Sequence, residues 1–189
     1  NISSPNTPGL RGLQQKEELR GLLSAIRALR KTEAERYGRL PVLVKIAPDL
    51  SRAEQYDVAE TAMECEVDGL IISNTTVAER DGLCSTHKKE TGGLSGKPLW
   101  RMSTECLREI YKVTEGKLPL IGVGGITSGD DAYAKIRAGA SLIQLYSALV
   151  FHGFGLVEQI KAQLAARLQA DGFSHISEAV GVDAHTSLY

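Results

Sequence analysis

Short polar side chains crowd the start of the chain, which reads NISSPNTPGL over residues 1–10. Pro5 and Pro8 restrict the backbone that carries them. A polar loop on a stiffened backbone is suited to holding a polar ligand, although a plain surface turn has the same composition. The side chains that offer hydroxyl or carboxamide groups, which both donate and accept hydrogen bonds, are Asn1, Ser3, Ser4, Asn6 and Thr7.

A lysine inside an apolar run is the second signal for chemistry. Lys45 lies in VLVKIAP, a segment typical of a buried strand. Lysine is rarely buried without a partner. Lys45 is therefore either a fixed cation facing a ligand that gains negative charge or a strand-end side chain that reaches water.

Two glycine-rich segments resemble phosphate-binding loops, but neither carries the full fingerprint. In TGGLSGKP (91–98), Thr91 replaces the leading glycine of a P-loop and Pro98 replaces its Ser/Thr. In GVGGIT (122–127), Thr127 occupies the third glycine position of a dinucleotide loop. Tight turns are the alternative explanation. The position of Gly124-Gly125, at the end of a predicted strand, nevertheless matches the phosphate site of many barrels.

The elements that must position these residues alternate between strand and helix. Because the predicted strands are apolar without alternation, they indicate an α/β fold with a parallel sheet covered by helices. Asn1-Ile2 is compatible with the end of a fifth strand. Hydrophobic spacing predicts helices over 13–37, 49–67, 98–113, from Ser128 onward and over 155–169, and strands over 41–48, 68–74, 118–125 and 141–147.

Barrel and open-sheet arrangements both fit this alternation. A complete (β/α)8 barrel usually takes roughly 250 residues, so a chain of this length would supply only part of one. We expect residues 1–189 to form one incomplete domain, the second half of such a barrel. In barrels and open parallel sheets alike, ligands bind at the carboxyl ends of the strands, where the polar residues gather in this sequence.

Composition excludes several function classes. A net charge of −1 argues against a nucleic-acid scaffold, which would carry a basic face. The three cysteines are scattered and odd in number, which disfavours a disulfide framework or a zinc site and favours a reducing compartment. The histidines show no ligand spacing, so we expect no metal. No apolar run approaches the length of a membrane-spanning helix, and no signal peptide is visible.

Six segments together resemble the dihydroorotate dehydrogenase family, in order and with fitting spacing. They are NISSPNTPGLRGLQ, VLVKIAPDLS, DGLIISNTT, ETGGLSGKPL, LPLIGVGGI and IRAGASLIQLYSAL. The resemblance is to the membrane-associated, quinone-using class 2. It implies a flavin-containing (β/α)8 barrel that oxidises dihydroorotate to orotate in pyrimidine biosynthesis. By this resemblance the chain starts near the fourth barrel strand, and the region that admits quinone lies outside it.

The resemblance also implies a catalytic pair in the opening loop. Ser4 matches the base that removes a proton from C5 of dihydroorotate while hydride leaves C6 for flavin N5. Thr7 matches the threonine that relays this proton through water, and Pro5 restricts the backbone between the two. Class 1 relatives carry cysteine where Ser4 stands, so the serine indicates class 2.

Binding residues follow from the same resemblance. The implied substrate-binding residues are Asn1, Ser4, Pro5, Asn6, Asn74 and Thr75. The implied residues for flavin mononucleotide (FMN) are Asn1, Lys45, Ser73, Gly96, Gly124, Gly125, Tyr146 and Ser147, with Lys45 beside the N1/O2 edge of the ring. Ser73 departs mildly from the threonine that relatives often have. The segment 77–94 matches a mobile lid over the substrate.

The resemblance implies ubiquinone as electron acceptor and membrane association through a region outside the chain. The carboxyl-terminal segment resembles mitochondrial relatives, which favours the mitochondrial inner membrane, with the bacterial inner membrane as the alternative. A barrel remnant that binds flavin without turnover is a second class of function. Another flavin barrel, such as a dihydropyrimidine or dihydrouridine oxidoreductase, is a second enzyme alternative. Those enzymes usually use a cysteine acid, and no cysteine falls in such a loop here.

Overall fold

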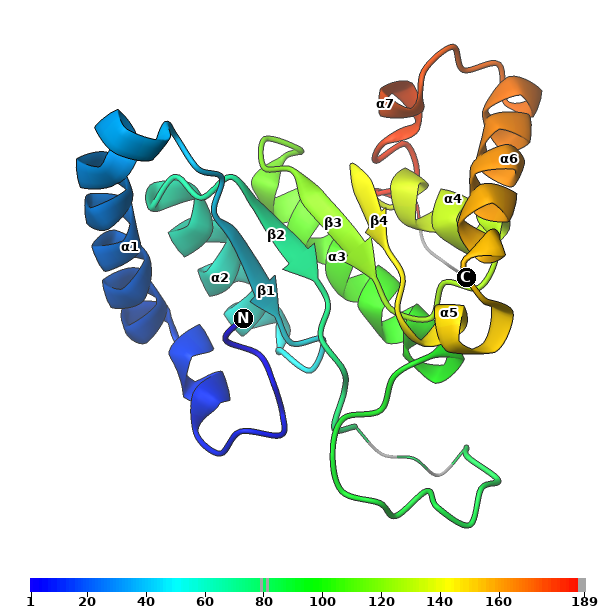
Figure 1. The fold of residues 1–189 in the computed structure, drawn as a ribbon, viewed down its shortest axis with the longest axis horizontal. Coiled ribbons are helices and arrows are strands. Elements are labelled where there is room, and N and C mark those ends of the chain that lie inside the picture. The colour runs from blue at the N-terminus through cyan, green and yellow to red at the C-terminus, as the bar shows by residue number, and fades with distance from the viewer. Residues whose placement is uncertain (79, 81, 187–189) are drawn as a thin grey trace.

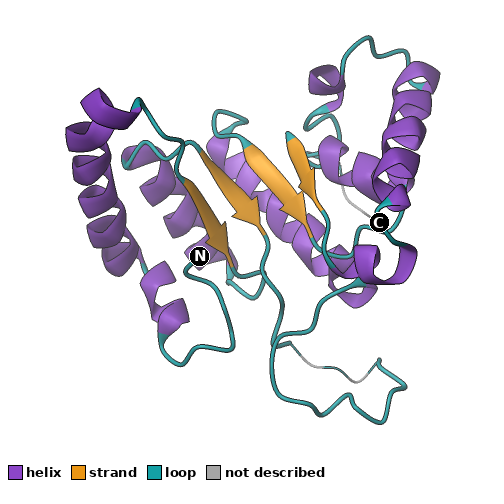
Figure 2. Ribbon diagram, in the orientation of Figure 1, coloured by secondary structure: helices purple, strands orange, loops and turns teal. Residues whose placement is uncertain are grey.

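The computed structural model describes residues 1–78, 80 and 82–186. Its four strands form one parallel sheet in the order β1-β2-β3-β4, so neighbours in sequence are neighbours in the sheet (Figures 1 and 2). A doubly wound sheet would reverse its strand order at a switch point, whereas a barrel runs sequentially. The order confirms the α/β class and favours the barrel. The strands are β1 (Leu43–Ile46), β2 (Gly69–Ile72), β3 (Leu120–Val123) and β4 (Leu142–Gln144).

Helices occupy the connections between the strands. They are α1 (Lys16–Tyr37), α2 (Arg52–Glu64), α3 (Trp100–Thr114), α4 (Gly129–Arg137), α5 (Ser147–His152), α6 (Gly155–Ala170) and α7 (Ile176–Ala179), with 3-10 turns η1 (Leu10–Gln14) and η2 (Lys97–Leu99). Local sequence fixes where α2 begins, because Ser51 and Glu54 form the predicted capping box. Ser128 likewise caps α4 by accepting a hydrogen bond from the amide of Asp131 at 3.1 Å.

The core lies between the sheet and the helices that cover one of its faces. Figure 1 shows α2 and α3 behind the strands, with α4 and α6 beside β4. Apolar side chains from both layers are fully buried there, which removes their surface from water and holds the layers together. The largest of them are Leu19, Ile46, Leu70, Ile72, Leu107, Ile110, Leu120 and Ile136.

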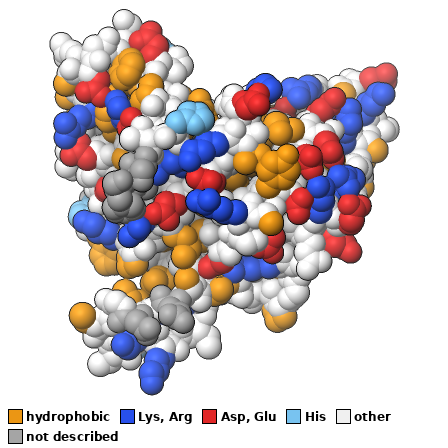
Figure 3. All heavy atoms as spheres, turned by 180° about the vertical axis from the view of Figure 1, so that it is seen from behind, with side chains coloured by type: hydrophobic (Ala, Val, Ile, Leu, Met, Phe, Trp, Pro, Cys, Tyr) orange, Lys and Arg blue, Asp and Glu red, His pale blue; other side chains and the backbone are white. Residues whose placement is uncertain are grey.

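The helices present a charged outer surface. Figure 3 shows acidic and basic side chains interspersed over this side of the molecule. Many of them pair across neighbouring helices: Lys16 of α1 lies 2.9 Å from Asp57 and 2.6 Å from Glu60 of α2. This mixture of signs is typical of a helix face that contacts water.

The two outer strands leave apolar side chains exposed. Leu43 of β1 is 41 % exposed and Leu142 of β4 is 62 % exposed. Phe151 and Phe154, which follow β4, are each at least 80 % exposed. In a closed barrel both edges of this sheet would pair with further strands.

The sequence-based boundaries differ from the structure at identifiable places. Each strand is shorter than predicted at both ends, because only its central residues pair with the neighbouring strands. The predicted helix 13–37 is preceded by η1, which begins after Gly9 in a left-handed conformation, with φ 75°. Asn1-Ile2 lies in no strand of the described chain. The short helices α5 and α7 were not predicted, because four to six residues are too few to show a helical period.

Candidate active site

The carboxyl ends of β1 and β2 meet the opening loop in a cluster of carboxamides and hydroxyls. Asn74 follows β2, and its Nδ2 donates to Asn1 Oδ1 and to Ser3 Oγ, each at 3.1 Å. Ser3 Oγ lies 2.7 Å from the carbonyl oxygen of Lys45 on β1. Asn74 Oδ1 accepts from the amide of Thr75 at 2.8 Å. The fold therefore joins Asn1 and Ser3 to Asn74 across 73 and 71 positions of sequence.

The two adjacent serines have different environments. Ser3 is fully buried, and its hydroxyl links the opening loop to β1 through its bond to the carbonyl oxygen of Lys45. Ser4 is half-buried, and its Oγ accepts a hydrogen bond from the amide of Asn6 at 3.3 Å. Because this bond uses a lone pair of Ser4, the hydroxyl proton stays available for another acceptor. Thr7 is exposed and makes no direct side-chain bond to Ser4 in the described chain.

A cavity of about 320 Å³ adjoins this cluster along the carboxyl ends of all four strands. Nine of the predicted site residues line it: Lys45, Ser73, Asn74, Thr75, Gly96, Gly124, Gly125, Tyr146 and Ser147. Leu99, Val123, Ile126 and Leu145 supply an apolar part of the wall. Asn74 and Thr75 belong to both the polar cluster and the cavity lining. The cluster and the cavity therefore form one continuous site.

Two parts of the cavity lining can bind a negatively charged group. Lys45 projects from β1 and makes no hydrogen bond or ion pair through its ammonium within the described residues. Its partial burial lowers the pKa of Lys45 below the ordinary value of a lysine. Elsewhere in the lining, the backbone amides of Gly124 and Gly125 also make no hydrogen bond within the described chain. Free amides of this kind suit a phosphate or carboxylate.

The predicted lid segment, 77–94, starts and ends at one point beside the polar cluster. Thr76 and Leu94 exchange backbone hydrogen bonds of 3.1 and 2.8 Å, which close the base of the loop. Arg80 binds the carbonyl oxygens of Glu90 and Gly92 from inside it. Gly93 lies against the cluster so closely that a Cβ there would be 1.9 Å from Thr75 Oγ1. Residues 79 and 81 of this segment lie outside the described residues.

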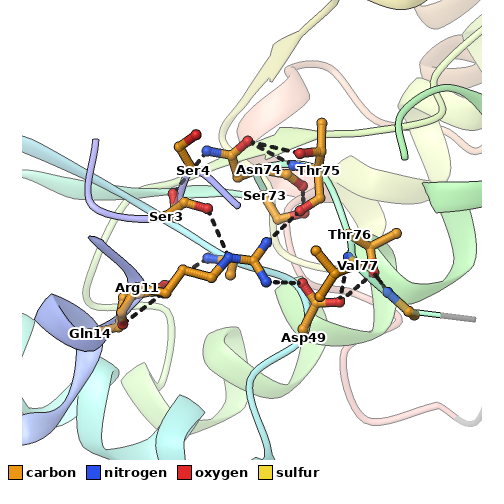
Figure 4. A network of polar contacts seen from close by, with 12 residues as sticks. Ser3, Ser4, Arg11, Gln14, Asp49, Ser73, Asn74, Thr75, Thr76 and Val77 are labelled. Atoms are coloured by element: carbon orange, nitrogen blue, oxygen red, sulfur yellow. Dashed lines mark hydrogen bonds and ion pairs between the residues drawn. The ribbon is translucent and has the colours of Figure 1, made fainter. Parts of the chain in front are cut away.

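Arg11 and Asp49 were not assigned a role from the sequence, and they hold the cluster together (Figure 4). Arg11 donates to the carbonyl oxygens of Ser3 at 3.2 Å and Thr75 at 2.9 Å, and pairs with Asp49 at 2.9 Å. Asp49 in turn accepts from the hydroxyl of Thr76. A single arginine in a loop gives no sequence signal for this role, because its partners come from three separate segments.

We expect Arg11→Met to lower the free energy of unfolding by about 2 kcal/mol, because hydrogen bonds to charged groups contribute roughly 1.5–3 kcal/mol each. Denaturant unfolding of the complete protein containing this segment measures it. Arg20→Met is the matched control, since Arg20 pairs with Glu17 and Glu64 on the exposed helix surface and should change stability much less than Arg11→Met. Equal effects of the two variants would contradict the role of Arg11.

The described residues contain no metal-binding cluster and no helix suited to cross a membrane. No group of three or more His, Cys, Asp or Glu side chains there is arranged to hold a metal ion. None of the described helices combines the length and the hydropathy that a bilayer crossing requires.

Sequential parallel strands, covering helices and a cavity at the strand carboxyl ends are the features of part of an α/β barrel, the class of protein that binds its ligands at this end. The family model for dihydroorotate dehydrogenase matches residues 1–168. The chain belongs to the dihydroorotate dehydrogenase family.

Curated relatives and solved structures agree with this assignment. A dihydroorotate dehydrogenase (quinone) of Parvibaculum lavamentivorans is 61 % identical over 97 % of this chain and 51 % of its own length. The mitochondrial quinone enzyme of Oryza sativa subsp. japonica is 52 % identical over 97 % of this chain and 39 % of its own. A crystal structure of DHODH from Eimeria tenella in complex with ferulenol superposes with a TM-score of 0.93 at 40 % identity, covering 99 % of this chain and 53 % of that one.

The chain thus spans about half the length, or less, of the relatives it matches. Together with the sequential parallel sheet, this likeness confirms the predicted fold, with the chain supplying part of an α/β barrel.

Proposed function

We propose that residues 1–189 form the carboxyl-terminal part of a single barrel domain that oxidises dihydroorotate to orotate in pyrimidine biosynthesis and passes the electrons to a quinone. The observation that carries this proposal is the continuity of the polar cluster with the cavity through Asn74 and Thr75. A substrate on the cluster would lie beside a cofactor in the cavity, which hydride transfer requires. Further strands of the complete protein would cover the exposed edges β1 and β4.

The opening loop and the end of β2 would hold the substrate. Carboxamides and a hydroxyl match the alternating donors and acceptors of a planar pyrimidine carrying a carboxylate. Ser4 would remove the proton from C5, and its proton would pass to water held near Thr7. Pro5 would limit the movement of the loop during this transfer. The proposed substrate-binding residues are Asn1, Ser4, Pro5, Asn6, Asn74 and Thr75.

The cavity lining fits a flavin nucleotide by the chemistry of its donors. Lys45 supplies a cation with no protein partner in the described chain, and the amides of Gly124 and Gly125 offer donors for a phosphate. When bound, flavin would supply the hydride acceptor for C6 of the substrate. The residues proposed to hold FMN are Asn1, Lys45, Ser73, Gly96, Gly124, Gly125, Tyr146 and Ser147.

The segment 77–94 is proposed to close over the substrate. Gly92 and Gly93 support this role, because a Cβ on Gly92 would lie 3.3 Å from Asn6 Oδ1 and a Cβ on Gly93 would lie 2.8 Å from Pro5 Cγ. A loop in this position would exclude water from the proton-transfer step.

Membrane association is proposed because a quinone acceptor dissolves in the lipid bilayer. The mitochondrial inner membrane stays a prediction, since the relatives include bacterial proteins and proteins with mitochondrial names. We propose ubiquinone as the acceptor.

Steady-state oxidation of dihydroorotate by the complete protein tests the proposal. We expect turnover with short-chain ubiquinone analogues and almost none with fumarate or NAD as acceptor. A preference for fumarate or NAD would overturn the quinone assignment. Bound flavin without any oxidation of dihydroorotate would favour a flavin-binding remnant or a different flavin barrel.

A further inference from the structure

The side chain of Lys135 is fully buried, although lysine is among the residues least often found inside a protein. Lys135 belongs to α4 and extends beneath β3, where its stem packs against Gly122. A Cβ at position 122 would lie 3.0 Å from Lys135 Cδ, so the glycine makes room for the lysine. Lys135 Nζ donates to Ser103 Oγ at 2.7 Å and to Thr104 Oγ1 at 2.9 Å, both on α3.

Both hydrogen-bond partners of Lys135 are neutral. The charged or titratable groups that face it are Asp131, on its own helix, and Cys106, on α3. Asp131 already accepts from the amide and hydroxyl of Thr127 at 2.9 and 2.8 Å. Burial raises the pKa of the Cys106 thiol to about 12, so this thiol stays uncharged. Because burial disfavours the ammonium form by more than the charge of Asp131 favours it, the pKa of Lys135 falls to about 7.

Ser103 connects this lysine to the glycine loop of the cavity. Ser103 Oγ lies 3.3 Å from the carbonyl oxygen of Gly124, and a Cβ on Gly124 would be 2.9 Å from Ser103 Oγ. Gly125 packs equally closely on the start of α3, since a Cβ there would be 2.5 Å from Trp100 Cβ. The loop therefore lies directly on the group that Lys135 binds, with its free amides available to the cavity.

We propose that Lys135 is a positioning residue for a phosphate bound at the amides of Gly124 and Gly125. It would fix the loop through Ser103 and place a buried positive charge behind it. The inference rests on the proposed function in one respect, that a flavin nucleotide occupies this cavity. Within the protein, only Asp131 offers Lys135 a negative charge among the described groups that face it, and the phosphate of that nucleotide would supply a further one.

If Lys135 had a purely structural role, removal of its amine would lower the unfolding temperature. The proposed role does not require this loss. Ser103 and Thr104 both also bond the carbonyl oxygen of Trp100, at 3.1 and 2.6 Å. Their hydroxyls therefore keep a partner in Lys135→Met, which also keeps an unbranched apolar stem. Replacing a buried charge by an apolar side chain of similar volume is often neutral or stabilising. We expect Lys135→Met to unfold at the same temperature as the parent or a higher one.

Flavin binding measures the proposed role. The complete protein containing this segment is freed of flavin and titrated with FMN and with riboflavin, which lacks the phosphate, by quenching of flavin fluorescence. Lys135→Met should weaken FMN binding by at least about tenfold and change riboflavin binding by less than about twofold. Lys161→Met is the matched control, because it removes the same charge from an exposed pair with Glu158 on α6 and should change neither affinity.

The pH dependence of the parent gives a readout that needs no variant. Phosphate has its second pKa near 6, so its charge is nearly constant between about pH 7.5 and 9. With its pKa near 7, Lys135 without flavin is mostly deprotonated in that range, and a bound phosphate that favours the ammonium form would cause a proton to be taken up. The ratio of FMN to riboflavin affinity should therefore fall as the pH rises, and Lys135→Met should abolish this slope. Taking the ratio cancels the effect of Lys45, which both flavins share.

Each outcome decides the inference. A selective loss of FMN affinity and a lost pH slope support it. Unchanged FMN affinity in Lys135→Met, or a flat affinity ratio in a parent that prefers FMN, overturns the inference and leaves the proposed function standing. Equal losses for FMN and riboflavin with a lower unfolding temperature return Lys135 to a structural role. A parent that binds neither flavin overturns the proposed function itself.

Discussion

Ser4→Ala is expected to retain flavin and to bind orotate, while the reduction of flavin by dihydroorotate slows by about 10²–10⁴-fold, the usual contribution of a positioned proton-transfer group. Binding should persist because the carboxamides of Asn1 and Asn74 are held by each other and by Ser3, with no contribution from Ser4. Single-turnover reduction, followed by flavin absorbance across pH, measures the step without the quinone reaction.

Two further variants of the opening loop sharpen this prediction. Ser4→Cys should keep part of the rate and move its pH dependence toward the pKa of a thiol, near 8.5. Thr7→Val should cause an intermediate loss if Thr7 helps to relay the proton, and almost none if it only shapes the turn.

Ser3→Ala is the matched control for the neighbouring position. It removes a buried hydroxyl that bonds the carbonyl oxygen of Lys45, so it should cost about 1–3 kcal/mol of stability. If Ser4→Ala reduced its flavin at nearly the parent rate, Ser4 would be a turn residue, and the base would have to be sought elsewhere in the complete protein.

Lys45→Met is expected to slow flavin reduction and to lower the flavin reduction potential, because the reduced cofactor loses a fixed cation. Lys45 contacts no protein anion in the described chain and lines the cavity, so its charge is available to a ligand. The expected loss of transition-state stabilisation is about 3 kcal/mol, within the range typical for removal of one preorganised donor or charge. Spectroelectrochemistry gives the potential, and stopped-flow absorbance gives the rate.

Because the pKa of Lys45 is lowered, the difference between the parent and Lys45→Met should depend on pH. The ammonium is lost as the pH rises through a value below that of an ordinary lysine, so the advantage of the parent over Lys45→Met should shrink toward alkaline pH. Lys45→Arg, which keeps a charge at all pH values, is the control and should not show this loss. An unchanged potential and rate in Lys45→Met would mean that Lys45 is a strand-end lysine without a role in the chemistry.

The sequence by itself determined the fold class and predicted nine of the residues that line the cavity. Apolar runs around Lys45, Ile71 and Ile121 predicted parallel strands, and the structure contains them. The capping box at Ser51 and the cap at Ser128 located helix starts, because caps depend on only a few adjacent residues. Parallel strands bring their carboxyl ends to one edge, so polar residues following different strands were expected to meet, and those of the cavity lining do.

Only the tertiary structure decided which of these residues contact one another. Ser3 and Ser4 are identical in type and adjacent, yet β1 buries one and leaves the other facing the loop. Arg11 and Lys135 gained their roles from partners more than thirty residues away, such as Thr75 for Arg11 and Ser103 for Lys135. Local patterns report on neighbours within one helix turn or strand. Burial and long-range hydrogen bonds exist only once the layers pack, and they determine which polar side chain supports the site and which one faces the ligand.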